Sequence, residues 1–170
     1  RANNWMTKNL ILAGNFNLTN VDELFGHLVE LGQHPKEVSD TVTVLERIGH
    51  FLDDEVQRLF NWHKGDSKKN YKKITKKIIH QLDIGRILKK ATKKFDGGYV
   101  MAGLLGHGDA FVIRDPAGIR PTYYYKDDEI VVVASERPVI QTVFNIPFED
   151  VKELEPGHAI ITKKSGKTNI

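Results

Sequence analysis

The sequence predicts an α+β fold, in which a block of helices is followed by a series of antiparallel hairpins. Between residues 20 and 95, apolar residues recur at the three- and four-residue spacing of helices that are buried on one face. After Gly97-Gly98 the period changes to two, and short apolar runs alternate with turns rich in Gly, Asp and Pro. Helices and strands that occur in separate blocks favour α+β over an alternating α/β arrangement.

The helical block follows one short strand. Asn9–Ala13 is predicted to be a buried strand, and the turn-forming sequence Gly14–Asn17 is expected to break it. Asn20 is expected to cap the next helix, with Glu23 in the capping-box position and Gly32 as the stop. The apolar spacing predicts helices over 21–31, 41–51, 53–62, 71–81 and 84–95.

The second block consists of hairpins. The turns Gly106–Asp109, Asp127-Asp128 and Glu155–Gly157 each separate two runs with strand-like character. These runs predict strands at 99–105, 110–114, 122–126, 129–134, 151–154 and 158–162, with a short helix at 136–144. The chain is predicted to form one domain over residues 1–170.

The composition excludes several kinds of site. The 170 residues contain no cysteine, which excludes disulfides and cysteine-ligated metals. The seven histidines show no metal-ligand spacing, so no metal site is expected. No apolar run approaches the roughly 20 residues of a membrane span, and no signal peptide is visible. These features predict a cytoplasmic protein with no membrane partner.

The charge is unevenly distributed. Lys64–Lys94 contains 12 of the 25 basic residues and two acidic ones, so it carries +10, whereas the rest of the chain carries −7. This segment is predicted to be a basic helical insertion at about 64–94. The lysine-rich helices predicted at 71–81 and 84–95 could bind nucleic acid through its phosphates, but Tyr71 and Phe95 are their only aromatic residues. A solvated helical face is therefore the expected role, and a nucleic-acid partner is not.

Three short motifs have candidate chemistry. Asn15 and the backbone N–H groups beside it could form an oxyanion hole, although Asn and Gly also favour simple turns. Asp40 could bind the ammonium group of an amino acid, or it could cap the helix that follows, as could Ser39. The sequence RDPAGIRP at 114–121 is either a rigid loop beside an active site or an inter-strand connection.

In their order along the chain, the motifs resemble the class II glutamine amidotransferases. Within this class they are most similar to the glutaminase domains of the amidophosphoribosyltransferase family, and the similarity covers about residues 10–166. The asparagine synthetases, which typically have GIKP where this chain has GIRP, are a related alternative. The motifs are LAGNFNLTN at 12–20, SDT at 39–41, GGY at 97–99, RDPAGIRP at 114–121, ASE at 134–136 and ELEPG at 153–157.

The resemblance implies a fold and a reaction. The fold is the N-terminal-nucleophile hydrolase αββα sandwich, with two antiparallel sheets between helices. An N-terminal cysteine attacks the side-chain amide of glutamine and releases glutamate and ammonia through a thioester. In the family's full enzyme, ammonia passes to a phosphoribosyltransferase domain and reacts with phosphoribosyl pyrophosphate to give phosphoribosylamine, in purine biosynthesis. Magnesium belongs to that second domain, the glutaminase domain needs no cofactor, and a homo-oligomer is expected.

The resemblance also assigns site residues. Asn15 matches the oxyanion-hole asparagine, and the backbone N–H of Phe16 matches the second donor. Asp40 matches the residue that binds the α-ammonium group of glutamine. Phe16 stands where the family usually has glycine, which tolerates dihedrals that phenylalanine does not, and Gly14 replaces a common histidine.

The chain also departs from the family pattern at its ends. The nucleophilic cysteine and the arginine that holds the substrate carboxylate are expected before Arg1, and the phosphoribosyltransferase domain after Ile170. The sequence therefore predicts a partial glutaminase domain, incomplete at the N-terminus, that cannot hydrolyse glutamine alone. The alternative is a non-catalytic relative that acts as a regulatory or binding module. An exposed apolar sheet edge is expected where the first strands are missing.

Overall fold

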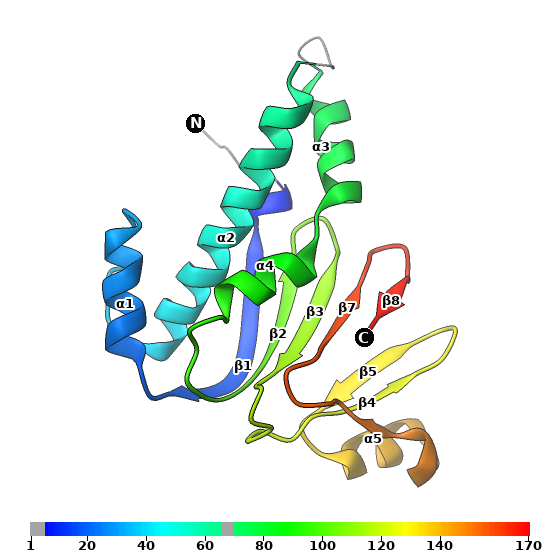
Figure 1. Ribbon diagram of the computed structural model, residues 1–170. Coiled ribbons are helices and arrows are strands. Elements are labelled where there is room, and N and C mark those ends of the chain that lie inside the picture. The colour runs from blue at the N-terminus through cyan, green and yellow to red at the C-terminus, as the bar shows by residue number, and fades with distance from the viewer. Residues whose placement is uncertain (1–5, 66–69) are drawn as a thin grey trace.

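Two antiparallel sheets and a cover of helices make up the computed structural model, which describes residues 6–65 and 70–170 (Figure 1). The larger sheet has the strand order β1-β2-β3-β7-β8, and the smaller has the order β5-β4-β6. Their strands are β1 (Leu10–Leu18), β2 (Gly97–Leu105), β3 (Ala110–Arg114), β4 (Tyr123–Lys126), β5 (Val131–Ala134), β6 (Lys152–Glu153), β7 (Ala159–Thr162) and β8 (Thr168–Asn169). The helices are η1 (Met6–Lys8), α1 (Val21–Glu30), α2 (Asp40–His63), α3 (Tyr71–Gln81), α4 (Ile84–Ala91), α5 (Arg137–Phe144) and η2 (Phe148–Asp150).

These elements form four layers. Helices α1–α4 lie on one face of the larger sheet, and the main core fills the space between them (Figure 1). The other face of this sheet turns toward β5, because residues of β1, β2, β3 and β5 line common pockets. Helix α5 contacts β4 and β5. The order helix, sheet, sheet, helix confirms the predicted αββα arrangement of antiparallel sheets.

The core follows from the two periodicities in the sequence. Alternate residues of β2, including Tyr99, Met101 and Leu105, are buried against the helices. The helices contribute one apolar stripe each, and Ile74 and Ile78 of α3 belong to the same core. The helices of the basic stretch are thus packed into the domain, while residues 66–69 of that stretch lie outside the described residues.

The first strand is longer than predicted. The sequence predicts that Gly14–Asn17 breaks the strand, but β1 continues to Leu18 and pairs with β2 from Leu10↔Leu105 to Leu18↔Gly97. Local turn propensity is overridden here because a nine-residue ladder with β2 satisfies the backbone. The candidate residues Asn15 and Phe16 therefore lie in a strand and not in a turn.

The predicted break at Asp53-Asp54 is also wrong. Helix α2 is continuous, and buried residues recur along it from Thr43 to His63. Asp53 pairs with Lys8, and Asp54 lies 3.7 Å from His50 one turn earlier. Both carboxylates lie on the exposed side of α2, next to Lys8 and His50. They are therefore compatible with the interior of a helix and do not mark the start of a new one.

The ends of helices α1 and α4 differ in part from those predicted. Asn20 occupies the N-cap position of α1 but makes no side-chain cap bond, so the predicted capping box is wrong. Its amide bonds the backbone O of Lys94 and the backbone N of Asp96, which ties α1 to the segment after α4. Gly32, with φ of 79°, ends α1 as predicted. Helix α4 ends at Ala91, short of the predicted Phe95.

The third predicted hairpin does not form. Strand β6 pairs with β4 in the smaller sheet, whereas β7 pairs with β3 in the larger one. The turn between them, in which Gly157 has a φ of 75°, carries the chain from one sheet to the other. Arg114 holds this crossing, because its guanidinium bonds Glu153 and the backbone O of Leu154. Strand β8, which the sequence did not predict, pairs with β7.

Candidate functional site

Strand β1 sorts its side chains onto two faces. Its even-numbered side chains, among them Leu12 and Phe16, pack against the core under the helices. The odd-numbered side chains Ile11, Ala13 and Asn15 line pockets on the side of the smaller sheet. Asn15 is exposed, and its amide makes no hydrogen bond to another described residue. An amide donor is thus available at the inter-sheet face.

The backbone of β1 offers donors at its free edge. Strand β1 is the first strand of the larger sheet, so only one of its edges is paired. The bonds Thr19 N–H to Asp96 O and Gly106 N–H to Asn9 O show that the odd-numbered residues face β2. The N–H groups of the even-numbered residues, including Phe16, therefore point away from β2.

Phe16 keeps the dihedrals of a regular strand. Asn145 is the only residue other than glycine with positive φ among the described residues, so Phe16 needs no backbone conformation reserved for glycine. Gly14 accommodates the phenylalanine, because a Cβ on Gly14 would lie 3.0 Å from the ring of Phe16 and 2.5 Å from the backbone O of Val100. A small residue at 14 and a large one at 16 thus form a matched pair.

Asp40 lies at the same edge of β1. Ser39, not Asp40, caps helix α2, because its hydroxyl accepts from the N–H of Val42 at 3.3 Å. The carboxylate of Asp40 accepts from the N–H of Leu18 at 3.0 Å. Since alternate residues of a strand are roughly 7 Å apart, Asp40 lies about that far along the edge from the N–H of Phe16.

The RDPAGIRP loop is rigid. The buried carboxylate of Asp115 accepts from the N–H groups of Ile119 at 2.9 Å and Arg120 at 3.0 Å. Burial alone would raise the pKa of Asp115, but the backbone N–H groups that bond it hold this pKa below its ordinary value. Arg114 closes the loop from the other side, with bonds to the backbone O of Arg120 at 2.7 Å and of Gly118 at 3.1 Å.

This loop and β1 line one pocket of about 540 Å³. It contains Asn15 and Gly14 from β1, Arg120 and Pro121 from the loop, and Glu136 from the start of α5. The structure therefore brings three of the motifs singled out in the sequence to one cavity: LAGNFNLTN, RDPAGIRP and ASE. Asp40, on the free edge of β1, is not among the residues that line this pocket.

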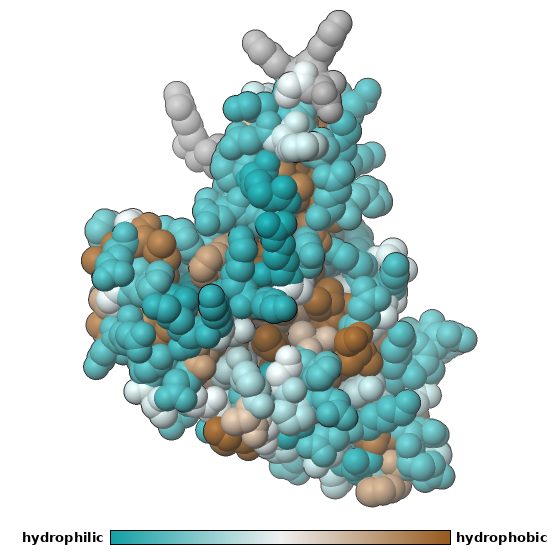
Figure 2. All heavy atoms as spheres, viewed as in Figure 1, coloured by the Kyte–Doolittle hydropathy of each residue, from teal (hydrophilic) through white to brown (hydrophobic). Residues whose placement is uncertain are grey.

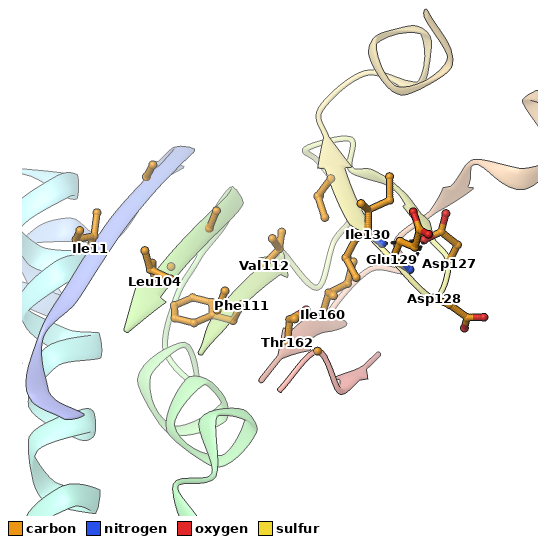
Figure 3. A pocket seen from close by; sticks show the side chains of 17 residues that line it. Ile11, Leu104, Phe111, Val112, Asp127, Asp128, Glu129, Ile130, Ile160 and Thr162 are labelled. Atoms are coloured by element: carbon orange, nitrogen blue, oxygen red, sulfur yellow. Dashed lines mark hydrogen bonds between the residues drawn. The ribbon is translucent and has the colours of Figure 1, made fainter. Parts of the chain in front are cut away.

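A neighbouring pocket of about 510 Å³ has a mostly apolar lining (Figure 3). Ile11, Leu104 and Val112 project from β1, β2 and β3 on one side of the larger sheet, and Ile130 lies across from them. Ile11 is 69% exposed and Leu104 is 47% exposed. Asp127, Asp128 and Glu129 of the β4–β5 turn also line the pocket, so it combines an apolar wall with carboxylates at one end.

The sequence did not indicate one buried polar cluster. The side chains of His107 and Asp109 are almost fully buried at 3.1 Å from one another, and Lys163 lies 2.8 Å from the same carboxylate. Burial alone would raise the pKa of Asp109, but its bonds to Lys163, Lys164 and His107 hold it below the ordinary value. Lys163 also bonds the backbone O of Leu82, so the cluster joins the β2–β3 turn, β7 and the end of α3.

The surface of α3 and α4 is hydrophilic (Figure 2). Its lysines are exposed, and those named here form no ion pair with another described residue: Lys72, Lys73, Lys76, Lys77, Lys89, Lys93 and Lys94. The described residues contain no group of three or more His, Asp or Glu side chains that could hold a metal ion. No described helix combines the length and apolar character that crossing a membrane requires.

The layers and strand order define an N-terminal-nucleophile-hydrolase-like fold. Two solved structures share it. The first is the glutamine phosphoribosylpyrophosphate amidotransferase from B. subtilis complexed with ADP and GMP, which is 22% identical with a TM-score of 0.63. The alignment covers 99% of this chain and 30% of that one.

The second is described as the allosteric regulatory enzyme of purine biosynthesis. It is 22% identical with a TM-score of 0.61, and the alignment covers 94% of this chain and 28% of that one. The chain thus spans less than a third of each structure, and at this identity the likeness shows the fold. No family model and no curated protein matches the chain.

Proposed function

We propose that the chain is the glutamine-binding part of a glutaminase domain in an amidophosphoribosyltransferase. The observation that carries the proposal is the grouping at β1. The unpaired N–H of Phe16 and the carboxylate of Asp40 lie along the free edge of this strand, and the free amide of Asn15 lies on the adjacent face, toward the smaller sheet. The solved structures with this fold support it, because the first is a glutamine phosphoribosylpyrophosphate amidotransferase.

Each group has a role in the proposed reaction. Asp40 binds the α-ammonium group of glutamine, and the side-chain amide then extends along the edge of β1 toward Phe16. The distance of roughly 7 Å between these positions is comparable to the length of an extended glutamine. Donors from Asn15 and Phe16 stabilise the negative charge that develops on the amide oxygen when a nucleophile attacks.

The nucleophile must come from outside the 170 residues, because they contain no cysteine. In the proposed mechanism a cysteine thiolate attacks the amide carbon, the C–N bond breaks with a proton transferred to the leaving ammonia, and water hydrolyses the thioester to glutamate. Ammonia is then used by a phosphoribosyltransferase domain. Cytoplasmic location and a role in purine biosynthesis belong to the same proposal.

The test uses the protein expressed together with the sequence that precedes Arg1. A glutamine-derived electrophile should label a cysteine there, and Asn15→Ala should lower kcat for glutamine hydrolysis about 10²- to 10³-fold through loss of one oxyanion donor. Asn61→Ala, a change of the same kind on the exposed side of α2, should leave kcat unchanged. Absence of a reactive cysteine, or an Asn15→Ala variant as active as the parent, would refute the glutaminase proposal.

The second candidate function is a non-catalytic module that binds glutamine. The pair Gly14 and Phe16 favours it, since this pair replaces the histidine and glycine expected from the family resemblance. Isothermal titration with glutamine, together with the labelling experiment, separates the two. Binding without covalent labelling supports the module, and labelling with release of ammonia supports the enzyme.

A further inference from the structure

The lysines of α3 and α4 follow one repeated pattern. The sequence KKITKK at 72–77 and the sequence KKATKK at 89–94 share the form KKxTKK. In both segments the threonine hydroxyl donates to the backbone O four residues earlier, at 2.9 Å from Thr75 and at 3.0 Å from Thr92. The lysines of both segments are exposed, because the apolar residues of the two helices face the core. The pattern therefore presents two clusters of cations to solvent.

The lysines of α3 do not stabilise their own helix. Lys72 and Lys73 lie in its first turn, where the helix dipole disfavours a cation, and no acidic residue occupies that turn. Like charges four residues apart, such as Lys72 and Lys76, repel one another. Asp83 is the one acidic residue between 70 and 94, and its carboxylate already caps α4. A role in binding an anionic partner accounts for this charge better than a role in folding.

A tryptophan stands beside the basic helices. Because α2 continues to His63, Trp62 lies in its last turn, and it is 74% exposed. Arg58, one turn earlier on the same face, bonds Glu55, and Arg86 of α4 lies 3.8 Å from the same carboxylate. Trp62 is therefore on the side of α2 that borders α4, where hydrophilic residues predominate over the helices (Figure 2).

A second aromatic residue lies where α3 begins. Tyr71 directly precedes Lys72 and is 60% exposed, and its ring stacks on that of Phe60 with the centroids 6.4 Å apart. Phe95, in contrast, packs against the core beside Tyr99. The exposed aromatic residues are thus at the end of α2 and the start of α3, which lie beyond the strands of the larger sheet (Figure 1).

We propose that this surface, formed by Trp62, Tyr71 and the lysines of the two KKxTKK segments, binds single-stranded nucleic acid without sequence specificity. The lysines neutralise phosphates, and the exposed rings stack on bases. Lysine suits phosphates of any sequence because it is a flexible point charge, whereas arginine has a planar fork that reads base edges. The solvated face expected from the sequence did not take Trp62 into account. An acidic polypeptide would use the lysines and leave the two aromatic rings without a role.

The first test measures the charge contribution on the intact protein, by fluorescence anisotropy of a labelled oligothymidylate. The logarithm of the binding constant should fall linearly with the logarithm of the salt concentration. In the double variant Lys76→Gln, Lys77→Gln this slope should be smaller by about 1.4, because each lost phosphate contact removes about 0.7. The matched control, Lys152→Gln with Lys167→Gln, removes the same charge from β6 and the β7–β8 turn and should behave as the parent.

The second test measures stacking. Trp62→Ala should raise the Kd for oligothymidylate about 5- to 100-fold through loss of one base–aromatic stack, with the salt slope unchanged, and Trp62→Phe should restore most of the affinity. Duplex DNA, whose bases already stack on one another, should bind the parent and Trp62→Ala equally. Asn15→Ala, which alters the proposed glutamine site, should bind oligothymidylate as the parent does, so the two proposals stand or fall separately.

Three results would overturn the proposal. Equal Kd values of the parent and Trp62→Ala for oligothymidylate would mean that the surface recognises charge alone. Displacement of the oligonucleotide by polyglutamate at an equal concentration of charge would assign the surface to an acidic protein. A parent protein that does not bind oligothymidylate at low salt would exclude nucleic acid. All the substituted side chains are exposed, so a loss of binding in these variants does not reflect unfolding.

Discussion

At the scale of single residues, the site depends on which polar side chains already have hydrogen-bond partners within the protein and which do not. Asp115 and Arg114 bond the backbone of the loop that follows them, including both the N–H and the carbonyl O of Arg120, while Nε of Arg120 keeps no partner. Asn15 is likewise free, whereas Asp40 already accepts one bond from Leu18 and keeps further acceptor capacity. The sequence indicates the residue types, but only their partners distinguish a structural carboxylate such as Asp115 from a candidate ligand-binding one.

Replacing Asp115 by asparagine should destabilise the protein by about 3 kcal/mol, because a buried acceptor of several N–H bonds is replaced by a group that is also a donor. The folded-state pKa of Asp115 is lowered, so its contribution is present above the unfolded-state pKa of 3.8 and is lost as pH falls through the folded value. Urea unfolding between pH 7 and pH 3 measures both effects.

The loss of stability between pH 4 and pH 3 should be smaller in Asp115→Asn than in the parent. Asp127→Asn is the comparison, because Asp127 also has a lowered pKa and accepts backbone N–H bonds, but on the exposed β4–β5 turn. An Asp115→Asn variant with the pH profile of the parent would contradict the assigned role.

At the scale of elements, helix α2 shows how far local signals can mislead. Asp53-Asp54 has the composition of a helix start, yet the buried stripe passes through it without a break. The same holds for β1, where turn-forming residues lie within a continuous strand. In both elements, long-range packing and pairing outweigh the local preference of two to four residues.

Proline at residue 53 tests the continuity of α2. In a continuous helix Asp53→Pro removes a backbone bond and clashes with the preceding turn, so it should cost about 3 kcal/mol or more. At the first position of a separate helix, proline would be tolerated. Asp53→Ala, which only removes the partially exposed pair with Lys8, should change the free energy of unfolding by less than about 1 kcal/mol in thermal or urea unfolding. Equal stability of the two variants would indicate a helix break at this point.

At the scale of the whole molecule, the two faces of the larger sheet differ. One face is buried under α1–α4, and the other presents Ile11 and Leu104 in a partly open space between the sheets (Figure 3). The free edge of β1 borders this space. The sequence predicts an exposed apolar sheet edge, whereas the exposed Ile11 and Leu104 lie on a face of the sheet, Ile11 on the edge strand β1.

The double variant Ile11→Thr, Leu104→Thr should therefore reduce binding of a hydrophobic dye to the native chain. Its free energy of unfolding should change by less than about 1 kcal/mol, because threonine is common in strands and the substitutions remove little buried apolar area. Met101→Thr, on the opposite face of β2, should cost about 3 kcal/mol because Met101 is fully buried. Dye fluorescence and urea unfolding measure the two effects. A double variant as unstable as Met101→Thr would mean that this face is packed in solution.

The sequence alone determined the local elements of this protein and the order of its motifs. Period and turn chemistry predicted most helices and the β2–β3 and β4–β5 hairpins, because the spacing of apolar residues reflects which face of an element is buried. They did not predict the β7–β8 hairpin. Tertiary structure decided the rest: that β6 and β7 join different sheets, that Asp115 is structural, and that Asn15 and Arg120 line one cavity. These outcomes depend on contacts between residues far apart in the chain, and no local pattern encodes such contacts.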